Sequence, residues 1–205
     1  MEMDDSRFTR DRSRMVRDQL IPRGICDPRV LSAFETVPRH LFIPEDELEW
    51  AYSDFPLPIG YTQTISQPYI VALMTEKLRL TGTEKVLEVG TGSGYQAAIL
   101  SKLAAEVHTV EIIPELARTA RKRFETMGIA NINIHEGDGS LGYHLFAPFD
   151  AITVTAAAPL VPRPLLEQLN DGGRMIIPVG SRGYQELELW QRSGESFHSE
   201  TIIPV

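Results

Sequence analysis

The fold of this chain is decided by one short stretch, Val86-Leu87-Glu88-Val89-Gly90-Thr91-Gly92-Ser93-Gly94. An apolar run from Lys85 to Val89 predicts a strand, and three glycines at alternate positions follow it. Residues 95–103 then show the spacing of a helix. Strand, tight turn and helix in this order open a nucleotide-binding α/β sheet, in which glycine lets a ligand approach bare backbone.

The spacing of the glycines indicates which ligand this turn binds. The dinucleotide fingerprint is G-x-G-x-x-G/A, and its last position here is Tyr95. Glu88 precedes the first glycine at the mouth of the turn, where a carboxylate suits a cation better than a pyrophosphate. S-adenosylmethionine carries a sulfonium and an ammonium and no phosphate, so the turn favours this cofactor.

Two further acids stand at the ends of the next predicted strands. Glu111 follows the first glycine by roughly 20 residues, where a ribose diol expects a carboxylate. Asp138, in Gly137-Asp138-Gly139, is suited to the adenine edge. The alternative is that Glu88 caps the following turn and that the other two are ordinary loop acids.

Composition bounds the class of protein. The chain has 205 residues, 42% of them hydrophobic and 23% charged, which fits one globular domain. Its formal net charge of −8 argues against nucleic acid as a partner. Cys26 is the single cysteine, so neither an intrachain disulfide nor a cysteine metal cluster can form. The five histidines show no metal-ligand spacing, and no metal is expected.

The chain shows no sign of a membrane or secretory segment. Residues 1–5 are acidic and no apolar stretch follows them, so no signal peptide is expected. Residues 151–161, the most apolar stretch, are too few to span a bilayer. We therefore expect a cytoplasmic protein that binds no membrane, and a monomer.

The pattern of elements changes near residue 80. Before it, we expect a helix from Pro28 with Asp27 as its N-cap, a loop-rich extended crossing, and a helix over 67–80. After it, strands and helices alternate, which predicts parallel crossovers, and the tail alternates like antiparallel edge strands. The expected strands are 85–89, 107–111, 131–135, 149–154, 174–179, 186–190 and 199–203, with helices over 95–104 and 114–127.

A segment just before this core is more specific. Gln63-Thr64-Ile65-Ser66-Gln67-Pro68 resembles the signature Gln-Thr-Ile-Ser-x-Pro of protein-L-isoaspartate O-methyltransferases. The resemblance runs from about residue 15 to the end. It also includes Val37-Pro38-Arg39 followed by Phe42, the glycine turn through Tyr95, Gly137-Asp138-Gly139, Ala156-Ala157-Ala158-Pro159, and Gly172-Gly173 with Pro178-Val179-Gly180.

The resemblance implies a fold and an activity. The fold is a doubly wound, mostly parallel, Rossmann-like methyltransferase sheet over residues 81–205, with a substrate-side helical extension over 1–80 of the same domain. The activity is protein repair: a methyl group passes from S-adenosylmethionine to the carboxylate of an L-isoaspartyl residue in a damaged protein. The methyl ester then collapses to a succinimide, whose hydrolysis returns part of it to aspartate.

The resemblance also implies which residues form the site. Ser66 is the active-site serine, with Thr64 beside it. The cofactor positions are Glu88, Gly90, Gly92, Gly94, Glu111, Asp138 and Gly139, and the substrate-side positions are Ile59, Gln63, Ile65, Ala157 and Pro159. Spacing alone gives Ser66 a second interpretation, the cap of the helix that begins at Pro68.

The implied chemistry needs few groups. A carboxylate with a pKa near 4 is ionised at neutral pH, so no general base is required. Ser66 would hold the carboxylate by a hydrogen bond, in a partly dry cleft. The chain departs from the family at Thr62, where many members have glycine, and at its end, where relatives usually continue through another Val-Pro-Leu-type segment.

Three other functions remain open from the sequence. One is a methyltransferase with another substrate, and another is an NAD-dependent oxidoreductase. The third is a silent module that binds the cofactor without transferring a methyl group.

Overall fold

A parallel sheet built from the second half of the chain forms the centre of the molecule. The computed structural model describes residues 5–181 and 183–205. The acidic stretch over residues 1–4 lies outside them. The strands of the sheet are β3 (Lys85–Val89), β4 (Glu106–Glu111), β5 (Ile132–Glu136), β6 (Phe149–Val154), β7 (Leu169–Ser181), β8 (Tyr184–Ser193) and β9 (Ser196–Pro204).

The order of the strands creates the place for a ligand. In the described residues they form a seven-stranded sheet in the order β5-β4-β3-β6-β7-β8-β9. The strands from β5 to β7 pair in parallel, and β8 and β9 are antiparallel at the edge. The chain leaves β3 towards β4 and β5 and then returns to β6 on the other side. In such sheets ligands bind beyond the carboxyl ends of the strands at this reversal.

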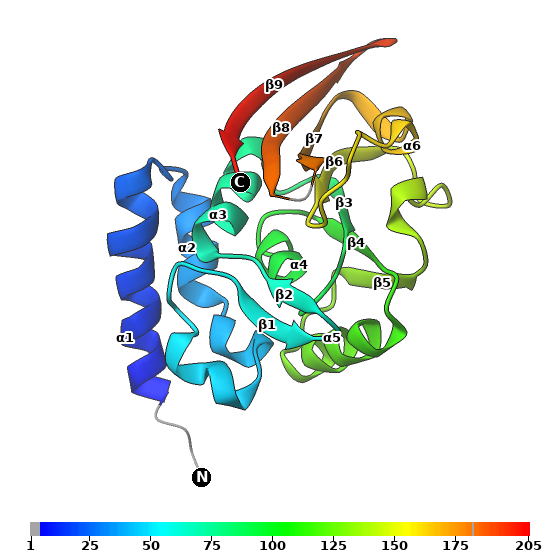
Figure 1. Cartoon of the computed structure of the whole chain (residues 1–205). Helices are drawn as coiled ribbons and strands as arrows, with labels where there is room; N and C mark the ends of the chain where they lie inside the picture. The colour runs from blue at the N-terminus through cyan, green and yellow to red at the C-terminus, as the bar shows by residue number, and fades with distance from the viewer. Residues whose placement is uncertain (1–4, 182) are drawn as a thin grey trace.

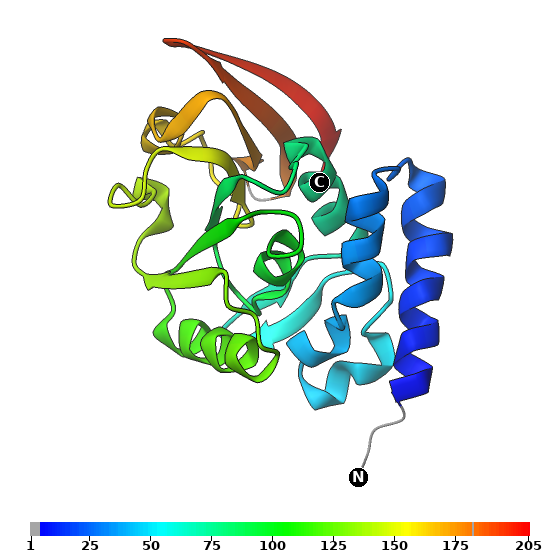
Figure 2. The ribbon, with the colours of Figure 1, turned by 180° about the vertical axis from the view of Figure 1, so that it is seen from behind.

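Helices and irregular segments cover the two faces of the sheet unequally. The helices are α1 (Asp5–Met15), α2 (Pro28–Thr36), α3 (Pro68–Leu78), α4 (Tyr95–Leu100), α5 (Pro114–Thr126) and α6 (Arg163–Glu167). The first five pack over one face, where α1 and α2 lie side by side and α3 lies between them and the sheet (Figures 1 and 2). The hydrophobic core on the opposite face of the sheet is covered by α6 and by side chains of the segment 143–149.

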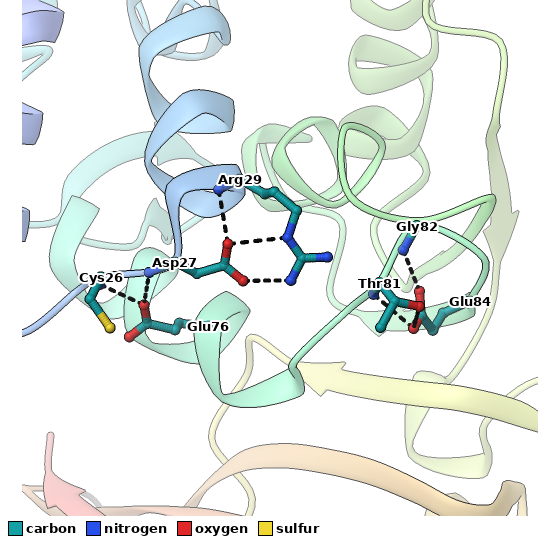
Figure 3. Close-up of polar contacts among 7 residues, drawn as sticks. All are labelled: Cys26, Asp27, Arg29, Glu76, Thr81, Gly82 and Glu84. Atoms are coloured by element: carbon teal, nitrogen blue, oxygen red, sulfur yellow. Dashed lines mark hydrogen bonds and ion pairs between the residues drawn. The ribbon is translucent and has the colours of Figure 1, made fainter.

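The N-terminal helices are joined to the core by hydrogen bonds from backbone amides. Asp27 caps α2 by accepting a hydrogen bond from the amide of Arg29, at 2.9 Å. The amides of Cys26 and Asp27 both donate to Oε1 of Glu76 on α3, at 2.7 Å (Figure 3). Just before β3, the carboxylate of Glu84 accepts the amides of the loop that leads into the strand. The start of α2 is therefore tied to α3.

The predicted fold class is confirmed, and three local expectations need correction. The crossing before α3 contains a two-stranded hairpin, β1 (Leu57–Gly60) with β2 (Gln63–Ile65), whose strands are too short to show a recognisable alternation. The helix expected over 67–80 ends at Leu78 because Arg79 adopts a left-handed conformation with φ of 52°. The helix expected over 95–104 ends at Leu100, where bonds three residues apart tighten the last turn.

No helix of the described residues is long and apolar enough to cross a membrane.

Candidate active site

A cavity of about 270 Å³ opens beyond the carboxyl ends of β3, β4 and β6, at the reversal of strand order. One wall is the glycine turn and the other is the hairpin segment that leads into α3. Most of the residues expected from the sequence line it: Gln63, Thr64, Ile65, Ser66, Glu88, Gly90, Gly92, Glu111, Asp138, Gly139 and Ala157. The structure thus brings the signature segment and the glycine turn, which are more than 20 residues apart, to one cavity.

The glycine turn has a backbone that side chains would obstruct. Gly90, Gly92 and Gly94 have φ of 95°, 51° and 90°, in the region that favours glycine. A Cβ on Gly90 would lie 2.5 Å from Oγ1 of Thr155, a contact too short to exist. The same Thr155 hydroxyl donates to the carbonyl of Gly90 at 2.6 Å, so the end of β6 holds the turn directly.

Three expected residues do not line the cavity: Gly94, Ile59 and Pro159. A Cβ on Gly94 would lie 2.7 Å from the ring of Phe124, so this glycine allows α5 to pack against the start of α4. Ile59 lies over the turn, since a Cβ on Gly92 would be 3.4 Å from its Cδ1. The hairpin therefore rests on the glycine turn.

Glu88 lies deeper than the sequence suggests. It was expected at the mouth of the turn, but its side chain is fully buried behind it and its Oε1 has no hydrogen-bond partner among the described residues. Its Oε2 accepts the hydroxyl of Thr109 at 2.5 Å, and that hydroxyl is 2.6 Å from the hydroxyl of Thr91. Burial raises the pKa of Glu88 to about 8, against the lowering effect of the Thr109 hydrogen bond. An unpartnered carboxylate oxygen in this position fits a cationic ligand.

The other two acids serve the backbone around the cavity. Glu111 is almost fully buried, and its two oxygens accept the amides of Gly92 at 2.7 Å and Ile113 at 2.9 Å. Asp138 is exposed and accepts the amide of Ser140 at 3.0 Å, and hydrogen bonding with the side chain of Ser140, and then with this amide, lowers the pKa of Asp138. Of the described residues, the charged side chains that line the cavity are these two and Glu88, so this part of the lining suits a cation and opposes a phosphate.

The structure decides between the two interpretations of Ser66. The N-cap of α3 is Gln67, whose side chain makes no capping hydrogen bond. The amide of Tyr69 in the first turn donates instead to Oδ1 of Asp54 at 3.0 Å, from 15 residues earlier in the chain. The Ser66 hydroxyl has no hydrogen bond within the described parts of the chain, and the half-buried side chain lines the cavity. Ser66 is thus not the cap of α3.

Several lining residues were missed by sequence reasoning. They include Ile112 from the loop after β4, Met74 from α3 and Gln96 from α4. They also include Thr91 and Thr155, which belong to turns. Only Thr91 carried a local signal, because it lies inside the glycine turn. His108 and His135 stack on one another outside the cavity, with Nδ1 of His108 3.0 Å from Nε2 of His135. In the described residues no group of three or more potential ligands could hold a metal.

The family described as "Protein-L-isoaspartate(D-aspartate) O-methyltransferase" matches residues 11–205. The chain belongs to this family. Membership confirms the resemblance and the predicted class of enzyme, and the oxidoreductase interpretation is wrong. Two curated relatives are a protein-L-isoaspartate O-methyltransferase of Picosynechococcus sp., 55% identical over 95% of this chain and 87% of its own, and one of Methanoregula boonei, 54% identical over 94% and 88%.

Solved structures of the family agree. A protein-L-isoaspartate O-methyltransferase that is 29% identical has a TM-score of 0.86 over 95% of this chain, which spans 64% of that longer chain. A Plasmodium falciparum protein of the same designation, solved with S-adenosyl-L-homocysteine, has a TM-score of 0.82 at 23% identity, over 95% of each chain. The second likeness shows the fold.

Proposed function

We propose that this enzyme methylates the carboxylate of L-isoaspartyl residues in damaged proteins and peptides, with S-adenosylmethionine as methyl donor. The observation that carries the proposal is that Thr64 and Ser66 line the same cavity as the glycine turn and Glu88. The methyl ester formed collapses to a succinimide, and hydrolysis returns part of it to normal aspartate.

The cofactor's place follows from the acids and the bare backbone of the turn. Glu88 would offer its unpartnered oxygen to the cationic part of the cofactor, and Glu111 and Asp138, which line the same cavity, would hold the ribose and the adenine. Gly90 and Gly92 let the cofactor approach the backbone between them. When bound, S-adenosylmethionine supplies a methyl group on a positively charged sulfur.

The substrate carboxylate is held without a cationic side chain. Among the residues that the structure describes, no lysine, arginine or histidine lines the cavity, so the proposed partners of the carboxylate are hydroxyl and amide groups. The Ser66 hydroxyl donates a hydrogen bond to one carboxylate oxygen and leaves the other free to attack. An ionised carboxylate needs no general base, so these residues orient it and exclude water rather than move a proton.

The partners are isoaspartyl proteins and peptides. The net charge of −8 disfavours a nucleic acid, and the chain acts as a monomer. Sedimentation of the purified enzyme with and without peptide tests whether the chain is a monomer.

The first test is transfer of a labelled methyl group to two peptides that differ only in an isoaspartyl or aspartyl linkage. We expect label on the isoaspartyl peptide alone, followed by release of labelled methanol as the ester closes to the succinimide. Label on neither peptide, with cofactor binding intact, would mean another substrate or a silent module.

The role of Ser66 is tested by Ser66→Ala. Losing a hydrogen bond to a charged group lowers turnover roughly 10- to 100-fold. The affinity for S-adenosylhomocysteine, measured by calorimetry, should stay the same. Ser101→Ala is the matched control, because the Ser101 hydroxyl bonds to Ala98 at the far end of α4. Near-normal turnover of Ser66→Ala would remove Ser66 from the reaction.

A further inference from the structure

One arginine of the N-terminal region is buried without a carboxylate partner. Arg39 lies in the short 3₁₀ helix Arg39–Phe42 and its side chain is fully buried. No ion pair among the described residues includes it. Burial lowers its pKa to about 10, so it still carries its charge at neutral pH. Keeping an unpaired charge inside a protein is costly, which calls for a reason.

The contacts of the guanidinium show what it holds. Its Nη2 donates to the carbonyl of Ser66 at 2.9 Å, and its Nε donates to the carbonyl of Ala51 at 2.9 Å. Its central carbon lies 4.9 Å from the centre of the Tyr95 ring. Tyr95 is the first residue of α4, immediately after the glycine turn. One rigid, planar group therefore touches the backbone of Ser66 and the helix that leaves the cofactor turn.

The residues that follow Ser66 are held by Asp54. Its Oδ1 accepts the amide of Tyr69, and its Oδ2 accepts the side-chain amide of Gln67 at 3.0 Å. Because Asp54 caps α3, the hydroxyl of Ser66 is not used in the cap. Arg39 then fixes the carbonyl of the same residue from the protein interior. Arg39 fixes the Ser66 carbonyl, and Asp54 fixes the residues after it. We infer that these two residues set the direction of the Ser66 hydroxyl.

We propose that Arg39 is a positioning residue for the methyl transfer: its guanidinium fixes the Ser66 carbonyl against Tyr95 and thereby aims the Ser66 hydroxyl at the substrate carboxylate. The inference rests on the proposed function of Ser66. Arg39 touches neither substrate nor cofactor, so it acts only through Ser66. Its removal should therefore affect turnover and leave cofactor affinity unchanged.

The test is a double-mutant cycle of Arg39→Met with Ser66→Ala. Methionine keeps an apolar chain against Tyr95 but donates no hydrogen bond. We expect Arg39→Met to lower kcat on the isoaspartyl peptide at least tenfold, with the Kd for S-adenosylhomocysteine within twofold of the parent's. In the Ser66→Ala background the same change should lower kcat less than twofold, because the hydroxyl that it aims is gone.

Arg39→Lys provides the conservative variant. An ammonium can reach one of the two carbonyls but cannot fork to both, so its kcat should fall between those of the parent and Arg39→Met. If Arg39→Met does not fold, Arg39→Lys carries the same cycle. The proposal would be overturned if Arg39→Met lowered kcat by the same factor with and without the Ser66 hydroxyl. It would also be overturned if Arg39→Met left kcat unchanged.

Phe42→Leu is the matched control for loosening of the core. Phe42 is fully buried and packs on the same Tyr95 ring, with ring centroids 5.5 Å apart, but it does not touch Ser66. We expect a lower melting temperature and an unchanged kcat for the folded enzyme. A kcat loss equal to that of Arg39→Met would mean that loosening Tyr95 suffices, and would overturn the proposal. Absence of turnover in the parent enzyme would instead contradict the proposed function.

Discussion

Two tight turns near the site reach positive φ in different ways: the glycine turn lines the cavity, and the hairpin turn just before Gln63 does not. In the turn after β3, each of the positions with positive φ is a glycine, at Gly90, Gly92 and Gly94. In the hairpin turn between β1 and β2, positive φ falls on Gly60 and then on Tyr61 and Thr62, at 52° and 58°. Gly90 and Gly94 leave no room for a side chain, whereas the hairpin turn carries side chains at Tyr61 and Thr62.

The difference is one of space rather than of dihedral angle. A Cβ at Gly90 or Gly94 would lie 2.5 or 2.7 Å from a neighbouring side chain. The hairpin turn points outward, and even a Cβ on Gly60 would meet nothing within 4 Å. A left-handed residue there costs only conformational energy, about 1 to 2 kcal/mol. Close packing makes glycine obligatory, and positive φ alone only makes it preferable.

The strongest test of this comparison is Gly90→Ala. The new methyl group would collide with Thr155, in addition to the cost of its φ, and would displace the turn at the proposed cofactor site. We expect at least a 100-fold loss of affinity for S-adenosylhomocysteine in calorimetry, and a lower melting temperature.

The control is Gly128→Ala, at φ of 66° with nothing within 4 Å of its Cβ. It should cost stability of about 1 kcal/mol and leave cofactor affinity unchanged. Wild-type affinity in Gly90→Ala would show that the turn can move away and that space is not what requires glycine.

A second prediction concerns the acid behind the glycine turn. With the pKa of Glu88 near 8, the free enzyme holds this carboxyl mostly protonated at pH 7. A cationic ligand favours the ionised form, so binding should release a proton, and affinity should fall up to tenfold per pH unit below pH 8. Calorimetry of S-adenosylmethionine in two buffers of different ionisation enthalpy measures the released proton. Glu88→Gln should bind without proton release and without this pH dependence.

The same group predicts the pH dependence of stability. The folded pKa of Glu88 lies above the ordinary value of 4.5, so between about pH 4.5 and 8 the folded state binds more protons than the unfolded state. The contribution to stability is complete below pH 4.5 and is lost as pH rises through this window. The contribution is measured by comparing the free energies of unfolding of the cofactor-free parent and of Glu88→Gln as a function of pH. A stability of the parent, relative to Glu88→Gln, that rises with pH in this window would contradict the assignment.

The smallest effect is expected in the hairpin turn, at Thr62→Asn. Asparagine tolerates left-handed conformations better than a β-branched residue, so up to about 1 kcal/mol of strain is relieved. For a chain of this length, we expect a rise of about 2 to 4 °C in melting temperature. Thr83→Asn, in an exposed loop, should have no such effect. A lower melting temperature for Thr62→Asn would show that the threonine side chain stabilises the turn.

Local patterns predicted the parts of the site that are contiguous in sequence. The glycine turn and Glu111 could be identified because a strand, its turn and the next strand end have nearly invariant spacing in this kind of sheet. Ser66 was identified by the segment that surrounds it. The depth of Glu88 was wrong, because the sequence shows where a strand ends but not what covers its last residues. Gly94 was expected to bind the cofactor but instead makes room for Phe124 of α5, and the sequence does not show which helix packs against the turn.

The sequence by itself determined the strands of the main sheet, the glycine turn and the signature around Ser66, because each depends on neighbours a few residues away. Only the tertiary structure decided that Asp54 caps α3, that Arg39 holds the Ser66 carbonyl, and that Thr155 touches Gly90. These contacts join residues 15, 27 and 65 positions apart. No local spacing specifies such contacts, since they form only when packing of the helices on the sheet brings distant backbones together.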